Sequence, residues 1–283
     1  MAPRAPTVLT PGGDCCLGPA TVCETAMNLS VLYENRVIAV AKTEQGLAWL
    51  IEHGPVVADP PLPTWMLKAL VADRRILRLR RGLFPAPTRE GRLPSFPATI
   101  NAVDPAGYIT GHGALSIHGL NDQDVSHWWS ITSRRQSDIR YGPYRAHFTL
   151  SPVQARQGHR TSLQVDGETV TLATVTQAFV DELRFMPYGL DWIETARVLR
   201  NALETQRIDE HEVIRLLGPR PSIAVARRAG LLFEIVRSEP NPELLSIARK
   251  NDDITRLAGA TVTDKTWRLT LPFPRERILR AIR

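Results

Sequence analysis

The sequence contains very little cysteine. Its three cysteines, Cys15, Cys16 and Cys23, all lie near the start of a chain of 283 residues. Adjacent cysteines cannot easily pair with each other, and an odd number leaves one over, so the pattern disfavours a disulfide framework. A zinc site needs a fourth ligand, and the first histidine in the chain is His53. We therefore expect no disulfide and no metal in this segment.

The sequence also lacks an apolar run long enough to cross a membrane. The best candidate, residues 31–40, is interrupted by Glu34, Asn35 and Arg36. The first eleven residues have no apolar core of the kind that a signal peptide carries. We therefore expect a cytoplasmic protein with no membrane partner.

Acidic residues are fewer than basic ones. The chain has 29 Asp and Glu against 35 Lys and Arg, which gives a net charge of +6. A basic protein of this size attracts acidic partners, most often nucleic acid. Its hydrophobic fraction of 43% is that of a globular protein, and its length is sufficient for two domains.

Common catalytic signatures are missing. The chain has no G-x-S-x-G, no P-loop and no H-E-x-x-H motif. His112 and His118 are six residues apart, a spacing that does not place two metal ligands on one helix face. His118 precedes Gly119, a helix-ending residue type, so we interpret it as a cap or core histidine.

A nuclease needs clustered carboxylates to hold Mg²⁺. Asp166 and Glu168 flank a predicted hairpin turn, while Asp181 and Glu182 lie on a predicted helix. Both pairs are better explained by turn and helix structure. We therefore predict no catalytic residues and no cofactor, and expect that the protein is not an enzyme.

Composition and periodicity divide the chain into three parts. We predict a flexible N-terminal tail over 1–27, a winged-helix DNA-binding domain over 28–92 and a mixed α/β C-terminal domain over 93–283. The predicted fold class is therefore α+β, with an N-terminal winged helix-turn-helix domain and a larger mixed α/β domain after it. In the larger domain we expect helices at 114–120, 173–186, 191–205, 209–216 and 222–232, strands at 128–133, 146–151 and 266–271, and a hairpin within 162–170.

The N-terminal domain is predicted from the order of its elements. A first helix starts near residues 28–30, and a second runs from an N-cap at Thr43 to Gly54. A third helix spans about 63–74. Leu77 and Leu79 alternate with arginines as in a half-buried strand, Gly82 supplies a tight turn, and residues 83–84 start the return strand. Helix, loop, helix and hairpin in this order are typical of a winged helix.

Basic side chains are concentrated in this helix and hairpin. Six cations lie between residues 68 and 81, with one acid, Asp73. Side chains on the exposed face of such a helix reach base edges, and a basic hairpin grips phosphates. The predicted DNA-binding residues are Thr64, Trp65, Lys68, Arg74, Arg75, Arg78, Arg80 and Arg81.

Two simpler interpretations stay open at this point. A basic helix and hairpin can be a solvated surface with no ligand. Trp65 can equally be a core or interdomain residue, since large aromatic side chains are buried on average.

Four segments resemble the AbiEi-like antitoxins of abortive-infection, type IV toxin–antitoxin systems. Residues 78–85 are similar to the basic, glycine-tipped hairpin of that family, and residues 108–120 to its small-residue run and Ser-Ala-Leu-x-x-His-Gly-Leu-like helix. Residues 173–181 resemble the helix in which an Asp follows an apolar pair, and residues 226–232 the Arg-x-Gly turn. Gly113 stands where the family commonly has Ser, and Leu231 where an aromatic residue is frequent.

This resemblance implies a repressor that binds double-stranded DNA at inverted repeats in its own promoter. It also implies a cognate toxin of the nucleotidyltransferase fold, counteracted functionally and in some systems by direct contact. One winged helix reads few base pairs, so we expect more than one protomer on the DNA. A nucleoid-associated cytoplasmic location follows from this role.

Two other classes of protein remain as alternatives. The first is a DNA-processing enzyme, a nuclease, in which the winged helix delivers DNA to the second domain. The second is a protein-binding toxin neutraliser with no role at DNA.

Overall fold

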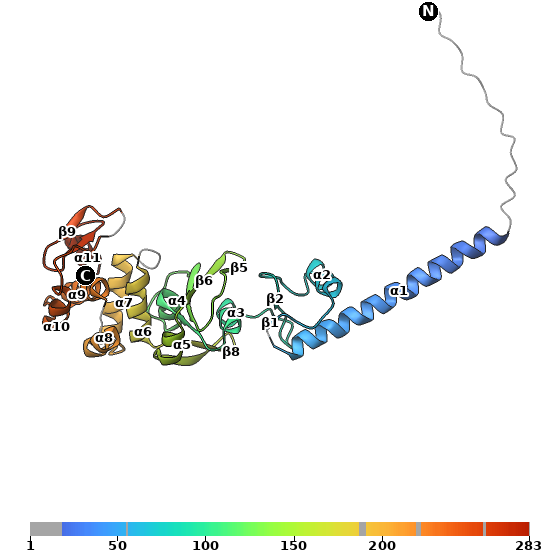
Figure 1. Cartoon of the computed structure of the whole chain (residues 1–283), viewed down its shortest axis with the longest axis horizontal. Coiled ribbons are helices and arrows are strands. Elements are labelled where there is room, and N and C mark those ends of the chain that lie inside the picture. The colour runs from blue at the N-terminus through green and yellow to red at the C-terminus, as the bar shows by residue number, and fades with distance from the viewer. Residues whose placement is uncertain (1–18, 55, 187–190, 219–221, 257–258, 283) are drawn as a thin grey trace, which may run out of the picture.

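A computed structural model describes residues 19–54, 56–186, 191–218, 222–256 and 259–282 (Figure 1). Within these ranges the fold is mixed α+β, with eleven helices and a six-stranded sheet. The coarse fold class predicted from the sequence is therefore confirmed. The elements follow one another along the long axis of the molecule, from α1 at one end to α10 and β9 at the other (Figure 1).

The N-terminal part contains two helices and two short strands. They are α1 (Pro19–Glu52), β1 (Val56–Ala58), α2 (Thr64–Ala72) and β2 (Leu83–Pro85).

The middle part contains the six-stranded sheet and its flanking helices. They are α3 (Phe96–Val103), β3 (Tyr108–Thr110), α4 (Gly111–Ile117), β4 (His127–Thr132), β5 (Ile139–Tyr141), β6 (Tyr144–Leu150), α5 (Pro152–Gln157), β7 (Arg160–Val165) and β8 (Glu168–Ala173).

The C-terminal part is mostly helical. Its elements are α6 (Val175–Phe185), α7 (Trp192–Glu204), α8 (Glu210–Leu217), α9 (Ile223–Arg237), α10 (Pro242–Ala248), β9 (Val262–Asp264), β10 (Leu269–Leu271) and α11 (Arg275–Ile282).

The first two predicted helices form one continuous helix, α1, so the prediction of a break at Thr43 is wrong. The Thr43 hydroxyl donates to the carbonyl of Ala39, one turn earlier, at 2.8 Å. A threonine can satisfy its hydroxyl in this way inside a helix, and no proline interrupts this stretch. The helix begins at Pro19, inside the predicted tail 1–27, of which residues 1–18 lie outside the described ranges.

Gly46 allows α1 and α2 to approach closely. A Cβ atom at this position would lie 2.1 Å from the sulfur of Met66 on α2, closer than real side chains come. Gly46 therefore serves the packing of the two helices.

The predicted hairpin is present in part: residues 77–79 form no regular strand but hydrogen-bond to β2, and the strand that pairs with β2 is β1. Leu77 N donates to the Pro85 carbonyl at 3.0 Å, and Leu79 N to the Leu83 carbonyl at 3.1 Å. Gly82 has the positive φ of 73° that the turn requires. β1 then pairs antiparallel with β2, with Val57 opposite Phe84. The sequence analysis did not predict β1.

The strands β1 and β2 lie between two hydrophobic cores. On one face, Leu83 is buried in the large core that runs through the middle and C-terminal parts, and Val56 packs against it. On the other face, Val57 and Phe84 are buried with α1 and α2 in a small core. Successive side chains of a strand point to opposite faces, so this short ribbon joins the two cores.

The sheet has the strand order β5-β6-β4-β3-β8-β7. β4 and β6 are parallel, as are β3 and β8, and the other neighbours are antiparallel. The predicted turn at Asp166 and Gly167 is confirmed, because both residues have positive φ, 52° and 82°, and join β7 to β8.

The other predicted elements of the larger domain are largely confirmed. The helices appear as α4 and α6 to α9, with boundaries shifted by a few residues, and the strands as β4, β6 and β10. Gly230 on α9 lies against Trp267, where a Cβ atom would be 2.0 Å from the ring. None of the described helices combines the length and apolar character of a membrane span.

We predict that the small core depends on Leu70, a fully buried residue of α2. Leu70→Ala is expected to lower the free energy of unfolding of this part by about 2–5 kcal/mol, through lost burial and the cavity left behind. Val71→Ala is the matched control, since Val71 lies next to it and is only partly buried. Urea unfolding followed by circular dichroism measures both, and equal losses would contradict this core assignment.

Candidate nucleic-acid interface

Helix α2 buries one side and exposes the other. Met66, Leu67 and Leu70 are buried in the small core, whereas Thr64 and Lys68 are exposed. This pattern follows from the helical period, which places apolar positions on one face. The exposed face therefore carries the polar and basic side chains that the sequence singled out on this helix.

A groove of about 560 Å³ lies between α2 and the hairpin. Four of the eight predicted residues line it: Thr64 and Lys68 come from α2, and Arg78 and Arg81 come from the hairpin. The structure thus brings together, on one surface, side chains from the helix and the hairpin that the sequence assigned to one domain.

The groove carries three cations and one carboxylate, Asp59. The backbone N–H of Asp59 donates to the Gly82 carbonyl at 2.6 Å. A Cβ at Gly82 would lie 2.0 Å from Oδ1 of Asp59, so the hairpin tip needs glycine for this contact as well as for its φ. The remaining positive charge suits a phosphate group.

Arg74 and Arg75 lie away from this groove. Both line a separate hollow beside α1. Arg75 donates through both terminal nitrogens to the carboxylate of Glu44 on α1. This hydrogen bond raises the pKa of Arg75 and lowers the pKa of Glu44. The Arg75 guanidinium is therefore already engaged, while the Arg74 side chain is exposed after the end of α2.

Arg80 also has partners within the chain. Its guanidinium donates to the Ser137 carbonyl at 2.8 Å and to Oε1 of Gln136 at 2.6 Å. Burial lowers the pKa of Arg80, and the nearby charge of Arg134 lowers it further. Arg80 is therefore half-buried and hydrogen-bonded to the loop between β4 and β5, whereas Arg78 is exposed. Gln136 is 56 residues away from Arg80 in sequence, so the alternation of side chains along the hairpin could not reveal this contact.

Trp65 is 47% exposed on α2. The interpretation of Trp65 as a core residue is therefore wrong. An exposed aromatic ring on the same helix as Lys68 is available for contact with a partner.

Asp181, on α6, is fully buried and lies at the centre of a polar cluster. One or the other of its oxygens accepts from Thr110 at 2.7 Å, from Gln154 at 2.8 Å and from Gln177 at 3.0 Å. A terminal nitrogen of Arg184 also donates to Oδ1 of Asp181, at 2.6 Å. Burial is the main influence on the Asp181 carboxyl, and it raises the pKa. These donors give the side chain a structural role, as the sequence analysis expected.

A pair of histidines at the edge of β4 and β6 was missed by the sequence analysis. Nδ1 of His147 lies 2.7 Å from a carboxylate oxygen of Asp138, and Nε2 lies 3.3 Å from Nδ1 of His127. The two rings stack, with centroids 5.6 Å apart. The register of two parallel strands brings them together, which spacing alone does not predict. No group of three or more His, Cys, Asp or Glu side chains suited to a metal occurs in the part of the chain that the structure describes.

His118 caps α4 and is partly buried. Its Nε2 lies 2.8 Å from the Ala173 carbonyl, and Nδ1 lies 3.3 Å from a terminal nitrogen of Arg207. A neutral ring that donates from Nε2 and accepts at Nδ1 satisfies both contacts. Burial lowers the pKa of His118. The prediction of a cap histidine is confirmed.

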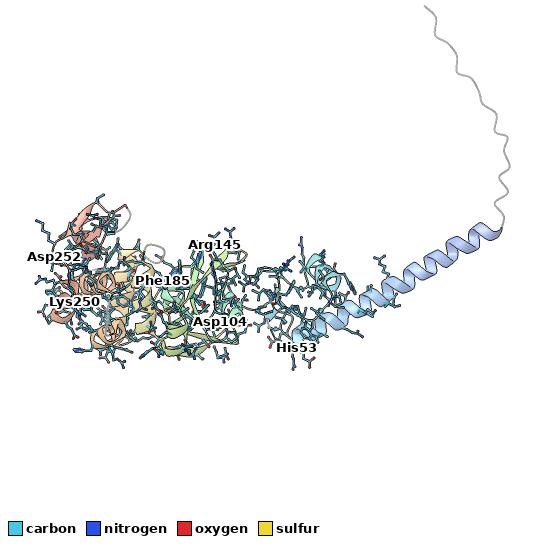
Figure 2. All side chains as sticks on the ribbon, in the orientation of Figure 1. His53, Asp104, Arg145, Phe185, Lys250 and Asp252 are labelled. Carbon is cyan, nitrogen blue, oxygen red and sulfur yellow. The ribbon has the colours of Figure 1, made fainter. Side chains whose placement is uncertain are left out.

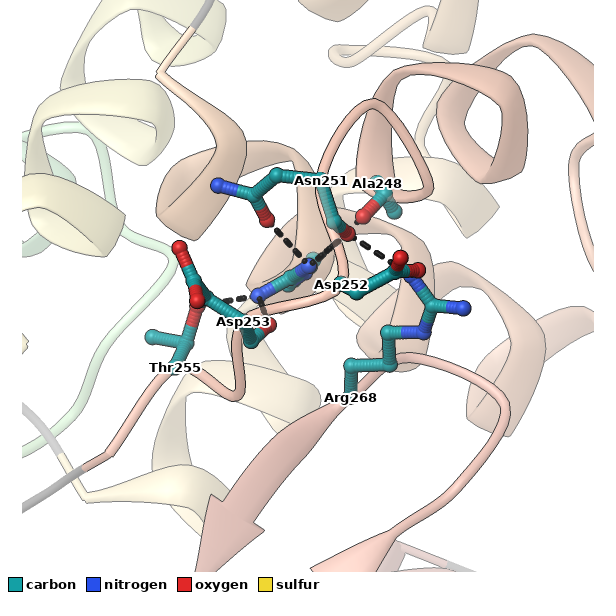
Figure 3. Close-up of polar contacts among 7 residues, drawn as sticks. Ala248, Asn251, Asp252, Asp253, Thr255 and Arg268 are labelled. Atoms are coloured by element: carbon teal, nitrogen blue, oxygen red, sulfur yellow. Dashed lines mark hydrogen bonds and ion pairs between the residues drawn. The ribbon is translucent and has the colours of Figure 1, made fainter.

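Arg227, in the segment 226–232, is buried and holds the chain that follows α10. It donates to the carbonyls of Ala248, Asn251 and Asp253 and to the Thr255 hydroxyl, and Figure 3 shows this cluster. A guanidinium has five donors in a fixed fork, which suits several carbonyls at once. This arginine therefore stabilises the C-terminal part and is not a surface cation.

No family model matches the sequence, and no curated protein matches it. Among solved structures, the chain is similar to the crystal structure of the Rv2827c protein from Mycobacterium tuberculosis. The TM-score is 0.57 and the sequence identity 14%, over 84% of this chain and 94% of that chain. A likeness at this identity shows a shared fold and nothing about function.

We predict that His118 makes folding stability depend on pH. The unfolded chain takes up a proton near the ordinary histidine pKa of about 6.5, whereas the folded chain resists it, so stability falls as the pH is lowered below about 6.5. His118→Gln is expected to reduce this loss between roughly pH 7 and pH 5. Urea unfolding at a series of pH values measures it.

The matched control is His211→Gln, at an exposed position on α8. It makes the same change of side chain, and its pH dependence is compared with that of His118→Gln. Equal pH dependence in the two variants would contradict the role assigned to His118.

Proposed function

We propose that this protein is a winged-helix DNA-binding protein that represses transcription. The observation that supports this function most directly is the groove between α2 and the hairpin. Its predicted residues Thr64, Lys68, Arg78 and Arg81 come from two elements and line one surface with an excess of positive charge.

In this proposal α2 enters the major groove of a duplex. Thr64 and Lys68 lie on its exposed face and contact base edges. Arg78 and Arg81 lie at the hairpin and bind backbone phosphates, which fix the position of the helix. Trp65 lies next to Thr64 and adds an exposed aromatic contact.

The target DNA and the biological role rest on the resemblance to the AbiEi-like antitoxins. We propose that the DNA is the protein's own promoter, and that the protein acts as the antitoxin of a nucleotidyltransferase-like toxin. The order of the four similar segments supports this role.

We predict that the triple variant K68Q/R78Q/R81Q binds DNA at least roughly tenfold more weakly at moderate salt, because three cations no longer displace counterions. The slope of log affinity against log salt should become shallower by about 0.9 for each lost phosphate contact, or roughly 2 for Arg78 and Arg81 together. Fluorescence anisotropy with a labelled promoter duplex and a scrambled competitor measures both quantities.

The matched control is the triple variant R249Q/K250Q/R256Q. These three cations are exposed in the C-terminal part, and Figure 2 shows Lys250 at the end of the molecule far from α1. The control loses the same charge and should bind DNA almost as tightly as the unaltered chain. Equal weakening of DNA binding in the two triple variants would mean that net charge alone determines the affinity, and the groove would not be the DNA-binding site.

We predict that two copies of the chain occupy one inverted repeat. A single winged helix reads too few base pairs for useful specificity. Half-sites read by paired units lie about 10 base pairs apart, or a multiple of that spacing. Native mass spectrometry of the protein with a duplex containing the full repeat should show two protomers. A saturated complex with one protomer on a full repeat would contradict this prediction.

A further inference from the structure

A second arginine-rich surface lies in the middle part of the chain. Residues 134–145, here called the arginine segment, include the loop before β5, the strand β5 and the start of β6. Four arginines lie in it, and Asp138 is its only acidic residue. Arg134, Arg135 and Arg140 are exposed, and Arg145 is half-buried.

The charge of these arginines is not neutralised by neighbouring carboxylates. Asp138 is directed to His147, which it contacts at 2.7 Å. None of the ion pairs among the described residues includes an arginine of this segment. The segment is therefore a strongly positive, solvated surface.

The arginine segment is fixed beside the hairpin. Arg80, on the hairpin, donates to Gln136 and Ser137, which lie inside the segment. Burial of Leu83 in the large core, 2% exposed, holds the hairpin there as well. The groove and the arginine segment are thus parts of one connected region of the molecule.

A positive charge of the arginine segment acts on Arg80, on the hairpin. The nearby charge of Arg134 lowers the pKa of Arg80, whose guanidinium hydrogen-bonds to Gln136 and Ser137 of the segment, and Asp59 offsets this effect only in part. Like charges held in this way are stabilised by an anion that contacts both neighbourhoods. The fold positions these charges for an anionic partner with groups at more than one point.

We propose that the arginine segment is a second DNA-binding surface, which contacts backbone phosphates of the same duplex that the groove binds. This inference rests on the proposed function and extends it. Arginine side chains suit phosphates, since a planar guanidinium donates two parallel hydrogen bonds. Tyr144 is 39% exposed at the start of β6 and adds a hydroxyl donor of the kind that contacts phosphates.

This surface has consequences that differ from those of a winged helix alone. Phosphate contacts carry no sequence information, so the arginine segment should raise affinity for all duplexes alike. It should also lengthen the stretch of DNA that each protomer covers.

The test compares R134Q/R135Q/R140Q with the control triple R249Q/K250Q/R256Q. Both variants lose three positive charges, and all six side chains are exposed. The segment variant is expected to bind promoter and scrambled duplexes at least about tenfold more weakly, with a salt slope shallower by roughly 2 to 3. Its hydroxyl-radical footprint should be shorter than that of the unaltered chain. Unchanged thermal unfolding confirms that the variant is folded.

The outcomes separate this inference from the proposed function. If the segment variant matches the control triple while K68Q/R78Q/R81Q still weakens binding, the inference is wrong and the proposed function stands. If the unaltered chain shows no salt-sensitive binding to any duplex, the proposed function fails and this inference fails with it. A loss on promoter DNA alone, with scrambled DNA unaffected, would also overturn the assignment to phosphates.

Discussion

The two-stranded ribbon of β1 and β2 holds the molecule together, because it is buried on both faces. Leu83 lies in the large core and Phe84 in the small one, and Val56 and Val57 repeat the same division on the neighbouring strand. Alternation of side chains along a strand makes this possible with only three residues per strand. The hairpin that ends in β2 is therefore fixed to the sheet as well as to α2.

This constraint explains why arginines in one short segment have different environments. Arg75 and Arg80 point toward the rest of the chain and are bonded there, to Glu44 and to the loop before β5. Arg78 and Arg81 line the groove. The residue type is the same in both pairs, and the position of the hairpin between two cores separates the environment of Arg80 from those of Arg78 and Arg81.

Local features of the fold could be predicted from the sequence. The apolar face of α2, the turn at Gly82 and the turn at Asp166 follow from side-chain period and from the backbone freedom of glycine, and the structure contains them. The continuity of α1 through Thr43 could not be predicted, because a capping residue and an interior residue look alike until the helix partners are known. β1 was missed because three residues are too few to show alternation.

The same distinction between local and long-range contacts applies to the residues of the candidate site. Thr64, Lys68, Arg78 and Arg81 could be selected from sequence because they lie on two elements that are close in the chain. The partner of Arg80 and the histidine pair on β4 and β6 depend on contacts between distant segments and on strand register. Such contacts have no counterpart in a single sequence. The arginine segment was not singled out from the sequence, and its place beside the hairpin depends on a contact between distant segments.

The most direct measurement is site-specific photo-crosslinking to a promoter duplex. A photoreactive phenylalanine analogue is placed in turn at Lys68, on the groove, at Arg135, in the arginine segment, and at Lys250, near the far end of the molecule (Figure 2). We expect the variants at positions 68 and 135 to crosslink to the same duplex, and the variant at position 250 to give no crosslink above background. Crosslinks of equal yield from all three positions, or none from position 68, would contradict it.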